Sequence, residues 1–267
     1  MRIISLGLGV QSTALYFLSS MGIIERADHA IFADPGAESQ QTYDYLEFLK
    51  KWQLENNGIP IMVMNERNIY DDIMSNDRRF ASIPGYTKDE KGKIGMLRRQ
   101  CTYEYKIYQV HSGIRLLQGL RKRERFRPTA IWIGITLDEV QRVKPSQDNW
   151  ARNIYPFVGL PYKSFFDKPW TRDDCIAFFK ENNLPVPPKS SCVFCPYQSS
   201  KRWLSCLDNP IDKKIALDVD SNIRDSSRKG VHAKIYLTKH CLPLDQVQFE
   251  DNSTDLFDNE CEGHCGL

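Results

Sequence analysis

The sequence predicts an α/β fold: a doubly wound, mostly parallel sheet followed by a small Cys-containing C-terminal region. Two observations support this. Short apolar strand-like segments alternate with segments whose apolar residues recur at helical spacing, and each strand candidate runs into a glycine-rich or polar loop. At 267 residues the chain is long enough for one such domain and a smaller extension.

The strand candidates lie in both halves of the chain. They are residues 3–4, 30–33, 59–64 and 130–135. Helices are expected between them, because apolar residues recur at helical spacing after Ser12 or Thr13, which can cap a helix, and again before Asn57-Gly58. Parallel sheets of this type bind ligands at the carboxyl ends of their strands.

The remaining segments are assigned by composition. Residues 76–97 are polar and are expected to form a loop over the site, and a helix is expected after Cys101. Thr171 to Asp174 has the pattern of a capped helix start. From Pro185 onward the chain is rich in Pro, Ser and Cys, so we divide it into a nucleotide-binding domain, 1–184, and a Cys-rich region, 185–267.

Composition narrows the functional classes. The 36 Lys and Arg residues nearly balance 34 Asp and Glu residues, so the net charge of +2 gives no global attraction to nucleic acid or membrane. No secretory signal pattern or long apolar segment is visible, and we expect a soluble cytoplasmic protein. In that compartment the eight cysteines indicate metal ligation or redox chemistry rather than disulfides.

The first candidate site follows the first strand, in the segment Ser-Leu-Gly-Leu-Gly-Val-Gln-Ser-Thr. Backbone N–H groups at a helix start, together with hydroxyl groups, can bind a phosphate, although an ordinary tight turn has the same pattern. The predicted contacts are Ser5, Gly7, Gly9, Gln11, Ser12 and Thr13.

This segment resembles the pyrophosphate loop of the adenine nucleotide alpha hydrolase superfamily. It is more similar still to the Gly-Gly-Gly-Val-Gln-Ser-Thr version of the phosphoadenosine phosphosulfate (PAPS) reductase-like proteins. The resemblance implies an adenine nucleotide, ATP or PAPS, as the ligand. Leu8 replaces a family glycine and Gln11 the family aspartate, which weakens the expectation of full ATP pyrophosphatase activity.

Two further segments extend the resemblance in the family's order, and with the later cysteine segments it covers roughly three quarters of the chain. The segment beginning at Asp34 and Gly36 is similar to the family loop that flanks the adenosine, and the resemblance makes these two residues nucleotide contacts. The segment from Gly134 to Arg142 is similar to the family's Gly-Ile-Arg-x-x-Glu-Ser-x-x-Arg motif, and Gly134, at the strand end, would let the nucleotide approach the backbone. There Glu139 and Arg142 can hold Mg²⁺ or phosphate oxygens, or simply pair with each other.

Three cysteines form a candidate metal site. Cys192 and Cys195 have Cys-x-x-Cys spacing, which suits a metal, a cluster or a redox pair. With Cys101 they resemble the cysteine set of iron-sulfur adenylyl-sulfate reductases, which implies a [4Fe-4S] cluster more than zinc. Thr102 replaces a second family cysteine, so either one iron site stays open or Cys206 or Cys241 completes the set. Cys175 is expected to be a buried apolar residue.

The C-terminus resembles the Glu-Cys-Gly-x-His tail of PAPS reductases. The resemblance makes Cys261 the nucleophile and His264 its partner, with a thioredoxin-like protein as reductant. Cys265 adds a thiol that could pair with Cys261 during turnover, and a tail with two idle thiols is the alternative.

These observations favour an enzyme that binds an adenine nucleotide and carries out sulfur transfer or reduction. One form is ATP-dependent thiolation of a tRNA or DNA acceptor with an iron-sulfur cluster, and the other is PAPS reduction by Cys261. The alternative from a different functional class is a non-catalytic nucleotide or redox sensor. A basic segment, residues 115–127, could steer nucleic acid to the site or form a solvated loop. The sequence does not indicate an oligomeric state.

Overall fold

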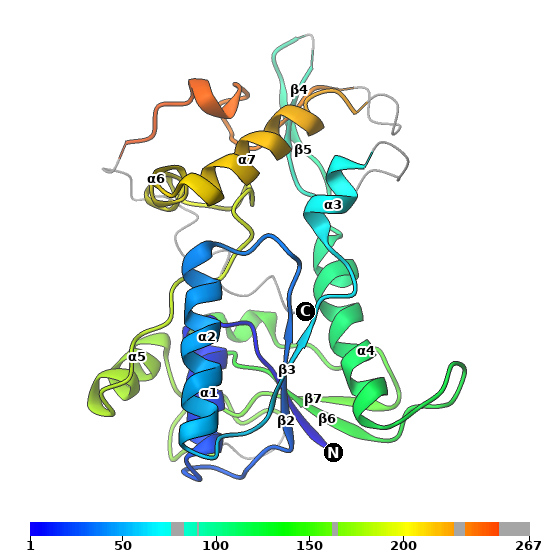
Figure 1. Ribbon diagram of the computed structural model, residues 1–267, viewed down its shortest axis with the longest axis vertical. Coiled ribbons are helices and arrows are strands. Elements are labelled where there is room, and N and C mark those ends of the chain that lie inside the picture. The colour runs from blue at the N-terminus through cyan, green and yellow to red at the C-terminus, as the bar shows by residue number, and fades with distance from the viewer. Residues whose placement is uncertain (76–82, 90, 162–164, 227–232, 251–267) are drawn as a thin grey trace.

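The computed structural model describes residues 1–75, 83–89, 91–161, 165–226 and 233–250 (Figure 1). Its centre is a five-stranded parallel sheet of order β3-β2-β1-β6-β7, which confirms the predicted fold class. The strands are β1 (Arg2–Ser5), β2 (His29–Ala33), β3 (Ile61–Met64), β6 (Thr129–Trp132) and β7 (Ala151–Ile154). β7 has no apolar pattern in the sequence and was not predicted.

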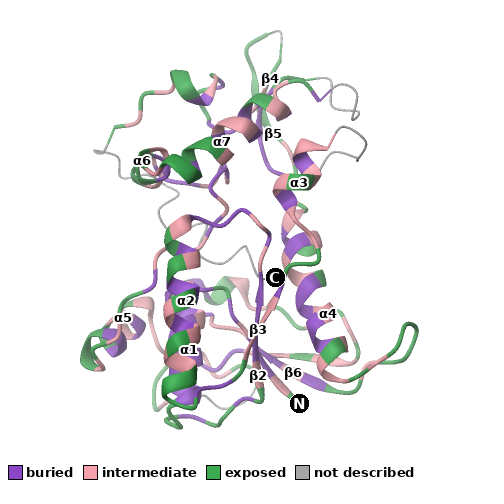
Figure 2. Ribbon diagram, in the orientation of Figure 1, coloured by how far each residue is buried: buried purple, intermediate pink, exposed green. Residues whose placement is uncertain are grey.

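Helices cover both faces of this sheet. Successive residues of β1 show the alternation that requires this: Ile3 packs with α4 (Tyr108–Leu117), whereas Ile4 packs with α1 (Val10–Ser20). Two more helices, α2 (Gln40–Glu55) and α5 (Arg172–Glu181), contribute to the core on the α1 side. Figure 2 shows the strands buried between these layers and the outer helix faces exposed.

The helix starts differ from the prediction in one case. α1 begins at Val10 with Gly9 as its N-cap, so the expected cap at Ser12 or Thr13 is wrong. The Ser12 hydroxyl instead bonds within the preceding loop, and Thr13 is fully buried. The start of α5 is as expected, because Thr171 and Asp174 form a capping box.

The strand order reverses direction at β1. The chain proceeds from β1 to β2 and β3 on one side, then returns to β6 and β7 on the other. Loops that leave β1 and β6 at their carboxyl ends therefore diverge, which opens a crevice between them. This crevice is where the candidate site lies.

A second group of elements packs at the carboxyl end of the sheet (Figure 1). It contains α3 (Ile69–Met74), α6 (Ser200–Asp208), α7 (Pro210–Ile223), the 3₁₀ turn η4 (Leu244–Gln246) and an antiparallel sheet of order β5-β4-β8. The strands of that sheet are β4 (Tyr86–Lys88), β5 (Ile94–Met96) and β8 (Ile235–Tyr236). The expected loop at 76–97 thus contains a hairpin, β4 with β5, which was missed because its strands are three residues long.

The core of this second group draws residues from both sides of position 185. Ile69, Ile83 and Tyr105 share one buried cluster with Phe194, Trp203 and residues of α7. No helix within the described ranges combines the length and apolar content needed to cross a bilayer.

Candidate functional site

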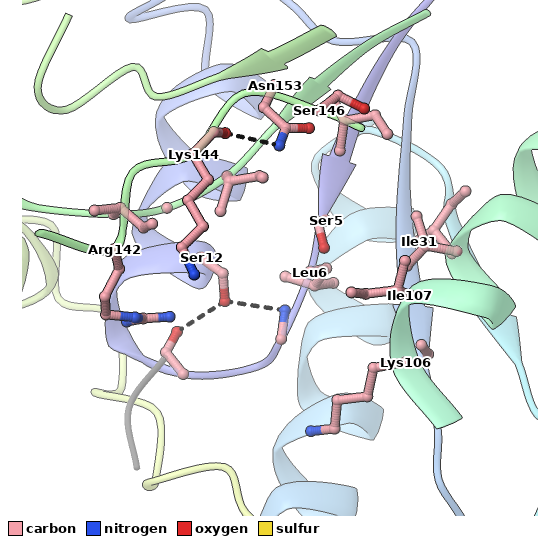
Figure 3. Close-up of a pocket in the computed structure, with 18 of the residues that line it drawn as sticks. Ser5, Leu6, Ser12, Ile31, Lys106, Ile107, Arg142, Lys144, Ser146 and Asn153 are labelled. Carbon is pink, nitrogen blue, oxygen red and sulfur yellow. Dashed lines mark hydrogen bonds between the residues drawn. The ribbon is translucent and has the colours of Figure 1, made fainter. Parts of the chain in front are cut away.

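A cavity of about 420 Å³ opens at the carboxyl ends of β1, β2 and β6 (Figure 3). This volume is in the range of small-molecule sites. Predicted residues that line it are Ser5, Gly7, Gly9, Gln11, Ser12, Gly134 and Arg142. The first and third sequence motifs therefore meet at one cavity.

The loop between β1 and α1 has a defined conformation. The Gly7 N–H donates to Ser12 Oγ at 3.1 Å, and Ser12 Oγ donates to the Gly9 carbonyl at 3.3 Å. Leu8, at the position of a family glycine, is fully buried and has a left-handed φ of 57°. The glycine-type turn is thus kept by a leucine whose side chain packs in the core, and the N–H groups of the first turn of α1 remain available to an anion.

Cationic side chains surround this loop. The described lining contains Lys106, Arg142, Lys144 and Lys189, against one carboxylate, Asp148. In Figure 3 the side chains of Arg142 and Lys144 extend toward Ser12, and Lys106 enters from the opposite wall. An excess of positive charge beside a helix N-terminus favours an anionic ligand.

Arg142 also makes the internal pair that the sequence allowed. Its Nη1 lies 2.7 Å from Glu139 Oε2, and both side chains are about nine-tenths buried. Gln11 Nε2 donates to the same Glu139 oxygen at 3.3 Å. Glu139 therefore positions Arg142 and Gln11, while Arg142 contributes to the cavity wall.

Two predicted contacts, Asp34 and Gly36, lie outside the cavity lining. Asp34 Oδ1 accepts hydrogen bonds from the Gly36 N–H and the Tyr43 hydroxyl, both at 2.8 Å. Gly36 has φ of 78°, and a Cβ there would lie 2.5 Å from the Asn68 side chain. Both residues shape the loop after β2, directly after Ala33, which lines the cavity.

A close backbone contact explains why position 134 is a glycine. A Cβ at this position would lie 2.7 Å from the Ser12 nitrogen and 2.8 Å from the Gln11 carbonyl carbon. The backbone that closely approaches Gly134 is therefore the start of α1. This contact holds the end of β6 against the phosphate loop.

The other part of the cavity combines an apolar wall with a polar end. Side chains from β2, β6 and α4 form the wall: Ile31, Ile107, Val110, Ile131 and Ile133. The polar end includes His111, Ser146, Asp148 and Asn153, none of which sequence reasoning identified. Burial lowers the pKa of His111, and the Asp148 carboxylate, 3.9 Å away, partly opposes this. An apolar wall beside a phosphate loop suits a nucleobase.

A second, much smaller cavity of about 30 Å³ contains the predicted cysteine set. Cys101, Cys192 and Cys195 all line it, although 90 residues separate the first two in the sequence. Its other walls are mainly apolar, with Arg99 and Lys106 as the cationic side chains. Among the described residues, no three His, Cys, Asp or Glu side chains form an arrangement that could hold a metal ion.

Lys106 lines both cavities. It lies in the π-helical turn η1 (Tyr103–Ile107), which joins Cys101 to α4. Its Nζ is 2.8 Å from Oε1 of Glu38, which is fully buried, and Glu38 Oε2 accepts from Ser190 Oγ at 3.0 Å. The backbone of Glu38 also pairs with that of Cys192 in a short β-bridge. Glu38 therefore connects the segment 189–195, called here the cysteine loop, to Lys106 in the wall of the larger cavity.

The other cysteines do not join this set. Cys206 and Cys241, the predicted alternatives for a fourth ligand, do not line the small cavity. Burial raises the pKa of Cys206 to about 12 and also raises the pKa of Cys241, which disfavours the thiolate that metals bind. Cys175 is fully buried, and burial raises the pKa of its thiol as well.

Cys261 and His264, the predicted catalytic pair, lie outside the described residues. The basic segment is described, and it connects the end of α4 to the start of β6. It therefore lies at the amino end of the sheet, opposite the cavity (Figure 1).

Comparison of the sequence with models of protein families and with curated proteins finds no match. The structure shows a Rossmann-like α/β fold with two cavities. The loop between β1 and α1 lines one, three cysteines line the other, and Lys106 lines both.

Proposed function

We propose that this protein is an enzyme that binds an adenine nucleotide through the loop from Ser5 to Thr13 and uses cysteine sulfur in a transfer or reduction step. The observation that carries the proposal is Lys106, which lines both the nucleotide cavity and the three-cysteine cavity. A cation at that boundary can hold an anionic reacting group within reach of both.

The chemistry of each cavity supports a distinct part of this proposal. The larger cavity offers the first amides of α1, the Ser12 hydroxyl and the charges of Arg142 and Lys144 to phosphate oxygens. Its apolar wall, which includes Ile31 and Ile133, can receive the base. The nucleotide is thereby oriented with its phosphates toward the loop.

The donor set of the smaller cavity suits a soft metal. Three thiols from Cys101, Cys192 and Cys195 are the ligand type of [4Fe-4S] clusters and of zinc. If Cys101, Cys192 and Cys195 held such a cluster, it would supply an iron without a protein ligand, at which sulfur could bind. Without a metal, the same thiols can act as sulfur nucleophiles.

Two reactions fit this arrangement. With ATP, cleavage at the α-phosphate releases pyrophosphate and adenylates an acceptor oxygen. Hydrosulfide from an external sulfur donor, delivered at the cysteine cavity, then attacks the adenylated carbon of the acceptor, and AMP leaves with the oxygen. With PAPS, a thiolate attacks the sulfate sulfur, adenosine 3′,5′-bisphosphate leaves, and a second thiol, from the protein or from a thioredoxin-like protein, releases sulfite as a disulfide forms. The first is favoured, because the thiols needed for it lie beside the nucleotide cavity.

Nucleotide binding is tested by calorimetry with ATP, PAPS and AMP. Lys144→Gln is expected to weaken ATP binding about tenfold or more, since a charged hydrogen bond contributes about 1.5–3 kcal/mol. Lys51→Gln is the matched control, because Lys51 is an exposed lysine of α2 that pairs with Glu55 on the same helix. Equal affinities in wild type and Lys144→Gln would exclude this phosphate site.

Sulfur chemistry is tested on anaerobically purified protein by its visible spectrum and its iron and zinc content. Replacing Cys101, Cys192 and Cys195 together with serine is expected to abolish a cluster or zinc signal, whereas Cys175→Ala leaves it unchanged. Release of AMP and pyrophosphate identifies the first reaction, and release of adenosine 3′,5′-bisphosphate the second. Absence of both products with every acceptor tested would leave nucleotide binding without catalysis, the sensor alternative.

A further inference from the structure

We propose that the β4–β5 hairpin and the chain that leads from it into η1 form a docking surface for a single-stranded nucleic acid. We call residues 86–99 the basic hairpin. That the bound strand is the sulfur acceptor rests on the proposed function, whereas its binding to the basic hairpin does not.

Charge is the first argument. The basic hairpin contains five basic residues and two acidic ones, although the chain as a whole is nearly neutral. Lys88, Lys91, Lys93 and Arg98 are exposed. Such a local concentration of cations attracts a phosphate backbone through counterion release.

The tip of the basic hairpin holds these lysines in place. The Asp89 carboxylate accepts the backbone N–H of Lys91 at 3.0 Å and of Lys93 at 2.7 Å, and Gly92 takes φ of 80° to close the turn. Asp89 therefore has a structural role in the turn. The lysine side chains project from an ordered scaffold, which reduces the entropy lost when they bind phosphates.

Exposed aromatic rings continue the surface toward the nucleotide cavity. Tyr103, two residues after Cys101, is 63% exposed and lines that cavity. Tyr108, one helical turn further, is 42% exposed, and the Arg67 guanidinium lies 4.5 Å from its ring centroid. The Tyr108 ring therefore has one face covered by Arg67, and Tyr103 is the more exposed ring. Basic residues followed by exposed aromatic rings are the pattern of single-strand binding, in which bases stack on the rings.

The chain leads from the basic hairpin directly to both cavities. The basic hairpin continues through Arg99, which lines the cysteine cavity, into Cys101 and then Tyr103. A strand whose phosphates follow the hairpin would place one base at the rim between the two cavities.

The segment 115–127 is a contrasting basic region. Arg115 Nη1 donates to the carbonyls of Arg121 and Glu124, and its guanidinium lies 4.3 Å from the Phe126 ring centroid. This segment lies at the opposite end of the molecule from the basic hairpin (Figure 1). It provides a control with similar charge and no path to the cavities.

The test is fluorescence anisotropy of the full chain with a labelled single strand of about 16 nucleotides, the upper range of sites of this kind. RNA, DNA and the matching duplexes are compared. Replacing Lys88, Lys91 and Lys93 with alanine is expected to weaken single-strand binding about tenfold or more and to lower the salt slope by about 2. Replacing Arg121, Lys122 and Arg125 with alanine removes the same charge and is expected to change binding by less than about threefold.

Equal losses in the two variants would overturn the proposal, because net charge alone would then explain binding. Unchanged binding in the basic-hairpin variant would also overturn it. The lysines would then have the role of keeping the exposed edge strand β5 from pairing with strands of other chains. Tighter binding of duplex, or equally effective competition by polyglutamate, would replace the single strand with duplex or with an acidic polypeptide as the partner.

Stacking is tested separately. Tyr103→Ala is expected to weaken single-strand binding about fivefold or more, and Tyr103→Phe to retain it, since stacking needs only the ring. Equal losses in both variants would reject stacking. ATP binding to the basic-hairpin variant is measured by calorimetry and is expected to equal that of the wild type, so failure of the surface and failure of the nucleotide site give different results.

Discussion

Leu8 allows the strain of the phosphate loop to be measured. It occupies the left-handed region, with φ of 57°, and its side chain is fully buried in the core. A residue with a Cβ pays about 1–2 kcal/mol for that conformation, and glycine avoids this cost. Replacing Leu8 with alanine or glycine should cost about 2.7–5 kcal/mol through the cavity that either change creates, but only the alanine variant retains the backbone strain.

The comparison uses Leu15, which is equally buried and lies inside α1. At Leu15 the alanine variant is expected to be more stable than the glycine variant by about 1 kcal/mol, the usual helix difference. At Leu8 that difference should shrink to zero or reverse, a change of about 1–2 kcal/mol between the two positions. Urea denaturation of the four variants measures it. An alanine advantage of about 1 kcal/mol at both positions would refute the strained loop.

Three further predictions concern other contacts of the site, each followed by urea denaturation. Gly134→Ala is expected to destabilise the fold by about 2 kcal/mol or more, because its Cβ would meet backbone atoms at 2.7–2.8 Å. Gly7→Ala, whose Cβ would meet only Ser12 Oγ at an ordinary 3.6 Å, should cost less than about 1 kcal/mol, and equal losses would contradict the backbone contact. Burial lowers the pKa of His111, so its contribution to stability is present above a pH of about 6.5 and is lost as pH falls through its folded pKa. His111→Asn should therefore reduce the stability that is lost at acid pH. An unchanged dependence of stability on pH would show that His111 does not cause that loss. Glu38→Gln should cost about 3 kcal/mol because it removes the carboxylate charge that faces a largely buried ammonium. Glu47→Gln, in an exposed pair, should cost under about 1 kcal/mol, and similar losses would show that the buried pair is weak.

The fold could be predicted because its signals are local and periodic. Ile3 and Ile4 face opposite layers of the sheet, as a strand buried on both sides requires. The meeting of Cys101 with the later pair was expected from resemblance alone, since no local pattern relates residues 91 positions apart.

The parts that could not be predicted depend on tertiary contacts. β7 has the sequence Ala-Arg-Asn-Ile, which carries no alternation, and it forms because β6 offers an open edge. Asp34 was predicted as a nucleotide contact, and the hydrogen bonds that its carboxylate accepts from Tyr43 and Gly36 had no signal in the sequence. Lys144 and Asn153 line the cavity through a tertiary contact, in which the Tyr155 hydroxyl donates to the Lys144 carbonyl at 2.6 Å and Asn153 Nδ2 donates to the same carbonyl at 3.1 Å.

The junction at Glu38 bears most directly on how the two cavities relate. A fully buried carboxylate is costly unless it is paired, and this one is shared between Lys106 of η1 and Ser190 of the cysteine loop. A phosphate that attracts Lys106 would weaken its pair with Glu38. The weakened pair would in turn change the hydrogen bond of Glu38 with Ser190 and its β-bridge to Cys192. Under the proposed function, a phosphate bound in the larger cavity is therefore expected to change the stability of the segment that carries Ser190 and Cys192. Such a connection would link nucleotide binding to the cysteines in the proposed enzyme.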